Sequence, residues 1–142
     1  MCSIHNIVRY CLHMTYIDGF VFVVKNADEE AYRAMAQKSS GVWRSHGALD
    51  FKECKGEDLR PKAPEGVPDD MKPNSFIDLL KAGSDETVWF SYITFKSREH
   101  RDEVNAAVMN DPFMNDPEWA SSPMPFDVRR MYTGGFHVEV GE

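Results

Sequence analysis

The sequence predicts an α+β fold in which two split β-α-β units share one antiparallel sheet. Apolar periodicity gives the order strand, helix, strand in each half of the 142 residues. Two proline-rich excursions, at residues 55–85 and 112–127, interrupt this order. The strand that opens each half is apolar on both faces, so both faces of the sheet need a cover.

Residues 16–24 and 87–95 are the strands with two apolar faces, because successive side chains of a strand point to opposite sides. In the first strand, one face carries Ile17, Val21 and Val23, and the other carries Tyr16, Phe20 and Phe22. In the second strand, one face carries Val88, Phe90 and Tyr92, and the other carries Trp89, Ser91 and Ile93.

The helix of the first half is predicted over residues 26–44. Asn26 and Glu29 have the spacing of an N-cap with a capping box. Gly47 provides a left-handed stop. Residues 48–54 then alternate between apolar and polar side chains, as in a second strand.

The helix of the second half begins at Ser97, which is a good N-cap residue. Residues 129–140 are predicted as the last strand, in which Gly134 and Gly135 indicate a bulge or a close backbone approach. Within the first excursion, residues 75–82 (SFIDLLKA) are apolar enough to dock on the rest of the protein as a short helix or an edge segment.

This element order is typical of a ferredoxin-like sandwich, an antiparallel sheet with both helices on one face. Two helices leave the other face uncovered. We expect that face to meet the same face of a second copy, because symmetric dimers are the commonest oligomers. The prediction is therefore a homodimer whose two sheets form a dimeric α+β barrel.

The composition argues against several partners. A net charge of −7, from 23 acidic and 16 basic residues, disfavours nucleic acid, whose phosphates need a basic surface. No run approaches the roughly 18 apolar residues of a membrane span. Three cysteines, an odd number, do not form a disulfide framework and favour a reducing cytoplasm.

No metal or cofactor is expected, since the sequence has no Gly-rich phosphate loop, HExxH or CxxC pair. Metal-binding side chains near the N-terminus are Cys2, His5, Cys11 and His13. Their spacing matches no structural zinc pattern. Residues 1–13 are expected to be a disordered leader or a non-native start, and residues 14–142 a single domain.

Several phrases of the sequence are similar to the YbaA-like bacterial proteins of unknown function. These phrases are YIDGFVFVV, WRSHGALDFKEC, SREHRDEVNAAVM, MPFDVRRM and GGF. The resemblance extends from residue 14 to about residue 139, and the chain departs from it in its leader and in a longer excursion around residues 60–73. It implies a dimeric α+β barrel and therefore a homodimer. The family brings no established activity, so the resemblance implies no catalytic residue.

Three residues are candidates for acid–base catalysis: Asp18, His46 and His100. Asp18 is a carboxyl group on an otherwise apolar strand, as is Glu53, and a buried polar group needs a partner. His46, at the end of the first helix, is either a base or a side chain that bonds the last carbonyls of the helix. Cys54 is expected to be a small buried apolar side chain rather than a nucleophile.

Four strand residues are candidates for binding a ligand: Trp89, Ser91, Tyr92 and His137. Ligand pockets are mostly apolar, with a few well-placed polar groups. These four side chains, together with Phe90, are expected to supply such a lining.

Four charged residues complete the set of binding candidates: Arg98, Arg101, Asp127 and Arg130. The first two would grip an anion at a helix N-terminus, or else belong to a solvated face with pairs such as Arg98–Asp102. The last two, beside Arg129, would line a pocket at the start of the last strand, or else form an ion-pair clamp at the dimer seam.

The first functional hypothesis is a cytoplasmic homodimer that binds a small molecule in or beside its barrel. The alternative is a cofactor-independent enzyme, similar to the monooxygenases or lyases among related barrels, that uses the acid–base candidates. An open pocket holding a carboxylate or imidazole with a displaced pKa would favour the enzyme. Nucleic-acid binding has the least support.

Overall fold

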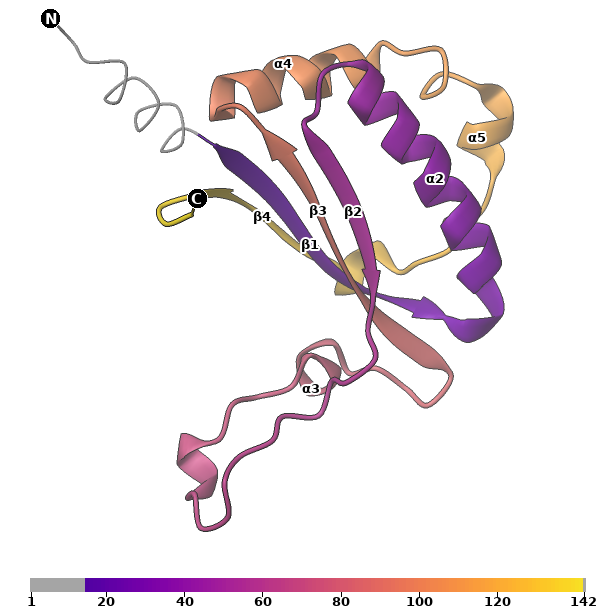
Figure 1. Ribbon diagram of the computed structural model, residues 1–142. Helices are drawn as coiled ribbons and strands as arrows, with labels where there is room; N and C mark the ends of the chain where they lie inside the picture. Colours follow the sequence, from indigo (N-terminus) through magenta and orange to yellow (C-terminus); the bar gives the residue numbers. More distant parts are fainter. Residues whose placement is uncertain (1–14, 142) are drawn as a thin grey trace, which may run out of the picture.

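The protein has one antiparallel sheet, with its long helices over one face (Figure 1). The computed structural model describes residues 15–141, so the predicted leader and its cysteine and histidine residues lie outside the described part. The strands are β1 (Tyr16–Lys25), β2 (Asp50–Lys55), β3 (Glu86–Phe95) and β4 (Tyr132–His137), in the order β2-β3-β1-β4. The helices are α2 (Glu29–Ser45), α3 (Phe76–Leu80), α4 (Arg98–Met109) and α5 (Pro117–Ser121). This arrangement confirms the predicted α+β, ferredoxin-like fold.

Strands β1 and β3 lie at the centre of the sheet and pair along their full length. Their register sends Phe22 and Trp89 toward the helices, where both are buried. It sends Val23 and Val88 to the opposite face, where they are also buried. Apolar residues on both sides of a strand are therefore explained by its central position, as predicted.

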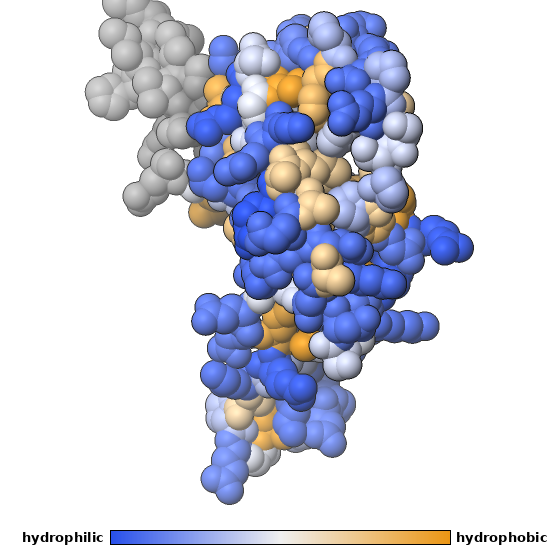
Figure 2. Space-filling model, turned by 90° about the vertical axis from the view of Figure 1, so that its right-hand side faces the viewer, coloured by the Kyte–Doolittle hydropathy of each residue, from blue (hydrophilic) through white to orange (hydrophobic). Residues whose placement is uncertain are grey.

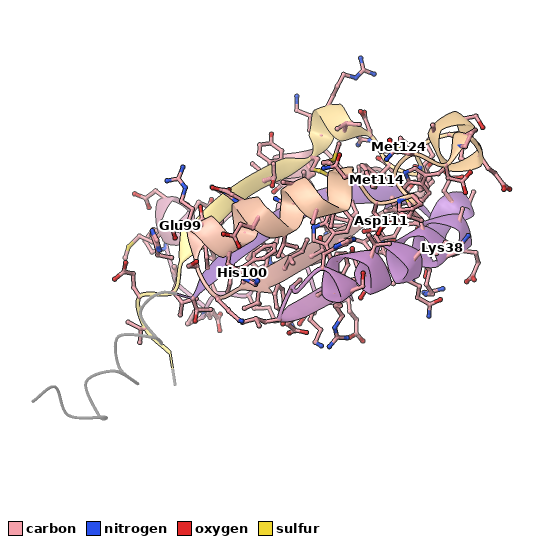
Figure 3. All side chains as sticks on the ribbon, turned by 90° about the horizontal axis from the view of Figure 1, so that it is seen from above. Lys38, Glu99, His100, Asp111, Met114 and Met124 are labelled. Atoms are coloured by element: carbon pink, nitrogen blue, oxygen red, sulfur yellow. The ribbon has the colours of Figure 1, made fainter. Side chains whose placement is uncertain are left out.

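Helices α2 and α4 lie side by side over the sheet, as the view from above shows (Figure 3). Under α2, the buried cluster contains Phe22, Val24, Tyr32, Ala36 and Trp89. Under α4, it contains Ala48, Ile93, Phe95, Val104 and Val108. Seen from the side on which α2 and α5 lie, the surface is mostly hydrophilic, with apolar side chains in small patches (Figure 2). The helices thus carry one apolar stripe each, as their periodicity indicates.

The helix ends agree with the sequence in one case and differ in the other. The Ser97 hydroxyl accepts a hydrogen bond from the backbone N–H of His100 at 3.0 Å, which confirms it as the N-cap of α4. The capping box predicted at Asn26 is wrong, because residues 26–28 form a 3-10 turn before α2 begins. The Asn26 side chain instead accepts a hydrogen bond from the Thr87 hydroxyl at 2.8 Å, which ties the ends of β1 and β3 together.

Strand β4 is shorter than predicted, because residues 128–130 form a 3-10 turn. The Asp127 carboxylate caps that turn by accepting from the Arg129 N–H at 3.0 Å. The glycine pair in β4 makes a close approach rather than a bulge, since its pairing with β1 is continuous. A Cβ atom on Gly135 would lie 2.1 Å from the Tyr16 hydroxyl, so only glycine fits under that side chain.

The first excursion packs on the face of the sheet that α2 and α4 leave open. Helix α3 confirms the short helix predicted within residues 75–82, and its Leu80 is buried with Val23 and Val88. In Figure 1 the rest of the excursion extends away from the sheet beside α3. The chain therefore covers one end of this face itself, whereas the sequence predicted that the whole face would be left uncovered.

Leu80→Ala should lower the free energy of unfolding by about 2–5 kcal/mol, because Leu80 is 1% exposed and its truncation leaves a cavity beside Val23. Its neighbour Leu79 is 49% exposed, so Leu79→Ala makes the same chemical change and should stay within about 0.5 kcal/mol of the parent. Urea denaturation of both variants measures the difference. Equal effects would show that α3 does not anchor the excursion.

Candidate functional site

An apolar cavity lies between α2 and the sheet, and we call it the α2 chamber. Its volume is about 190 Å³, and its wall includes Phe20, Phe22, Met35, Phe126, Met131 and Glu53. A second cavity of about 340 Å³, the α2 groove, adjoins it between α2 and β2. The chamber and the groove share Ala36, Phe51 and Glu53 in their walls. Glu53 is therefore the carboxyl group at the boundary between them.

Glu53 is held by the hydroxyl group of Tyr32, which donates a hydrogen bond to its Oε2 atom at 2.6 Å. The local cause is the alternation of β2, which turns Phe51 and Glu53 toward α2. Burial raises the pKa of Glu53, and the Tyr32 hydrogen bond partly offsets this. Burial and the adjacent Glu53 carboxylate also raise the pKa of Tyr32, so its phenol stays protonated.

Trp89 lies beside this pair and is 4% exposed. Its ring meets the Tyr32 ring edge-on, with 5.0 Å between the centroids, and it lines the α2 groove. Among the described residues, its Nε1–H is the buried side-chain polar group that has no hydrogen-bond partner. By contrast, the indole of Trp43 donates to Asn105 at 3.1 Å. An unpaired buried donor is uncommon in folded proteins and costs about 1–3 kcal/mol.

The structure brings the candidates Asp18 and Arg101 together, although they are far apart in the sequence. Nη1 of Arg101 donates to the Asp18 carboxylate at 2.7 Å, which joins α4 to β1. The guanidinium also bonds Asp102 at 2.7 Å and lies 4.9 Å from the ring centroid of Tyr16. Burial raises the pKa of Asp18 against the opposing effect of Arg101. The alternative pair Arg98–Asp102 is wrong, because Asp102 pairs with Arg101.

The histidine candidates lie away from the α2 chamber. His46 bonds Asp111 at 2.7 Å and so links the C-terminal ends of α2 and α4, rather than bonding helix carbonyls with its ring. Nδ1 of His100 accepts from the Lys96 N–H at 3.0 Å, at the start of α4. Figure 3 shows His100 and Asp111 at opposite ends of α4. The two histidines therefore do not belong to one site.

Asp127 and Arg130 line a third cavity, of about 350 Å³, together with Glu86. Arg130 bonds both oxygens of Glu86, at 2.9 Å through Nη1, and reaches Asp127 at 3.4 Å. The hydrogen bond from Arg130 lowers the pKa of Glu86 to about 2. These charges form an ion-pair cluster within one chain that also borders a pocket, and a clamp at a dimer seam stays a prediction.

The strand candidates do not form one pocket. Trp89, Ser91 and His137 project toward the helix side, whereas Tyr92 and Phe90 project to the opposite face, because residues of one strand alternate. The shared aromatic lining expected from the sequence is therefore wrong. Arg98 is exposed at the start of α4 and lines none of the three cavities described above.

Two residues of the α2 site escaped the prediction, and one strand residue was placed wrongly. Tyr32 was not among the candidates, and Glu53 was expected only as a polar residue on an apolar strand. The alternation of β2, which places Phe51 and Glu53 on one face, is the sequence signal that could have indicated the site. Cys54 is exposed on the helix-free face opposite Phe90, not buried, because it alternates with Glu53.

Within residues 15–141, no group of three or more histidine, cysteine, aspartate or glutamate side chains is arranged to hold a metal ion. In the same part of the chain, no helix has the length and apolar character needed to cross a membrane.

The chain is similar to proteins whose function is not known. Residues 15–128 match the family described as "Protein of unknown function (DUF1428)". The uncharacterized protein YbaA of Escherichia coli K12 and that of Shigella flexneri are each 40% identical to it over 129 residues, which are 91% of this chain and all of the relative.

A solved structure shows the same fold. The crystal structure of a dimeric ferredoxin-like protein from an uncultured marine organism matches with a TM-score of 0.54 and 14% identity, over 90% of this chain and 99% of that one. The fold and the sequence similarity agree, and this chain belongs to the DUF1428 family of proteins of unknown function.

Proposed function

We propose that the protein is a homodimer that binds a small molecule in the cavities beneath α2, beside its barrel. The binding role is supported mainly by the buried N–H of Trp89, which has no partner among the described residues. The Trp89 ring lies next to the Glu53–Tyr32 pair. A donor of this kind gains a hydrogen bond when a ligand supplies an acceptor. The wall of the α2 chamber is mostly apolar, and the adjoining α2 groove adds polar groups, a combination typical of ligand sites.

The homodimer is supported by the helix-free face of the sheet. Its exposed large side chains are Phe90 (44% exposed), Tyr132 (51%) and Phe136 (60%). They lie on β3 and β4, which flank β1 and pair with it at Val21, and α3 covers only the end of the face near Val23 and Val88. A contiguous apolar surface of this kind marks an interaction site. The solved ferredoxin-like protein is described as dimeric, which supports the same arrangement here.

An enzyme is the second candidate, and Glu53 is the observation that favours it. A carboxyl group with a raised pKa at the boundary of a cavity is a candidate for proton transfer near neutral pH. Asp18, His46 and His100 serve this role less well, because none of them lines the three cavities described above, whereas Glu53 lines two. In this version Glu53 would exchange a proton with the bound molecule, and Tyr32 would hold the carboxyl group in place.

Phe136→Glu should weaken dimerisation by at least about hundredfold, because a symmetric interface contains the change twice and buries both charges. Met109→Glu is the matched control, since Met109 is 62% exposed on α4 and away from the helix-free face. Sedimentation equilibrium across a dilution series measures both dissociation constants. A parent protein that is monomeric at micromolar concentration would contradict the homodimer.

Ser39→Leu should abolish ligand binding without loss of stability, because Ser39 lines the α2 chamber and leucine fills its space. A metabolite screen by thermal shift should find compounds that stabilise the parent, by about 2.7 kcal/mol at hundredfold excess over the dissociation constant. The same compounds should not shift the Ser39→Leu variant. A compound that stabilises both proteins equally binds elsewhere, and a screen with no hit contradicts the binding role.

Glu53→Gln should stabilise the protein relative to the parent at pH 7–8, and the gain should shrink toward pH 4. The folded-state pKa of Glu53 is raised, so its favourable contribution is complete below the unfolded pKa of about 4.5 and is lost as pH rises through the folded pKa. Glutamine does not titrate and keeps the acceptor for Tyr32. Unfolding free energies across this pH range test the sign; a gain that grows toward low pH would contradict it.

A further inference from the structure

We infer that the site beneath α2 selects an uncharged molecule with an apolar ring and one amide-like group, bound between the Trp89 indole N–H and the Glu53 carboxyl. This inference rests on the proposed ligand-binding function and specifies its position and ligand class. It follows from three features: the Trp89 Nε1–H that has no partner among the described residues, the Oε1 atom of Glu53, and the size and apolar wall of the α2 chamber.

The donor side of the site is Trp89. Its Nε1–H is buried and has no partner among the described residues, while its ring is held in place by Tyr32 at 5.0 Å. An indole donates and cannot accept, so the missing group is an acceptor such as a carbonyl oxygen. A ligand acceptor bonded to this N–H would remove the energetic cost of leaving it buried without a partner.

The second contact comes from Glu53. Its Oε2 atom accepts the Tyr32 hydrogen bond, and among the described residues no hydrogen bond reaches its Oε1 atom. Glu53 pairs with Ser91 and Lys55 pairs with Trp89, so Glu53 and Trp89 are diagonal neighbours on the face beneath α2. Diagonal neighbours lie roughly 7–8 Å apart, a span that one small molecule can bridge. An amide group presents a carbonyl oxygen and an N–H together, which matches this pair.

The α2 chamber determines the size and polarity of the part of the ligand that it holds. Its volume of about 190 Å³ exceeds the ~150 Å³ of a cavity that accepts benzene, so it has room for one ring. Phenylalanine and methionine side chains form much of its wall. An ion would lose its hydration there, and burial already favours the neutral form of Glu53. A carboxylate ligand would also meet Glu53 itself. These conditions select against charge in the chamber, whose wall does not include Arg33 and Lys55 of the adjoining groove.

Three probes with the same ring test the inference: benzamide, benzoate and benzylamine, titrated at pH 7 into the full-length ¹⁵N-labelled protein. Benzamide should shift the indole N–H signal of Trp89 and the amide signal of Ile93 in the chamber wall. Benzoate and benzylamine should bind at least about tenfold more weakly, because each carries a charge. Tighter binding of either ion would overturn the uncharged class, and an unmoved Trp89 signal with benzamide would overturn the site.

Variants separate the site from other binding. Trp89→Phe should weaken benzamide binding about five- to tenfold, since it removes one hydrogen bond and keeps an aromatic ring. Trp119→Phe is the matched control and should leave binding unchanged, because Trp119 packs on Phe113 in the second excursion. Equal effects of the two variants would overturn the role of Trp89. If the metabolite screen finds a ligand while benzamide fails, the proposed function stands and this inference falls.

Discussion

The pairing of β1 with β3 determines where the other described elements can pack. Both strands are apolar on both sides and run antiparallel along their full length, so they form a central ribbon that water must not reach. α2 and α4 cover one side of the ribbon, and α3 covers part of the other. The uncovered remainder, with Phe90 in it, is the surface to which we assign the dimer.

Three buried polar side chains on the helix side of the sheet differ in how the cost of their burial is compensated. Asp18 is paired with Arg101 from α4, so its charge is compensated within the chain. Glu53 is bonded by Tyr32 from α2 and takes a raised pKa, which favours its neutral form. Trp89 has neither solution among the described residues. The difference separates a structural ion pair from the group on which the proposed ligand site rests.

The two proposed roles occupy opposite faces of one sheet. Self-association uses residues such as Tyr132 and Phe136, which project away from the helices. Ligand binding uses Glu53 and Trp89, which project toward α2. Neighbouring residues of one strand serve the two roles in alternation, as Cys54 and Glu53 do in β2. A change in one role therefore need not disturb the other, although both depend on the same register.

Much of the fold was predictable because it depends on local patterns. The period of two predicted both faces of the central strands, apolar periodicity predicted the order of strands and helices, and Ser97 marked the start of α4. The predicted sites failed where distant residues decide the outcome. Nothing local indicates that Asp18 meets Arg101, or that Tyr32 meets Glu53.

The sequence by itself determined the elements, their order and the two apolar faces, since backbone period and side-chain polarity act over a few residues. The tertiary structure alone decided which polar groups are paired, where α3 docks, and that two of the described cavities lie beneath α2. Those outcomes depend on strand register and helix placement, which bring together residues such as Trp89 and Tyr32. A local sequence pattern does not specify the distance between residues that are far apart in the chain.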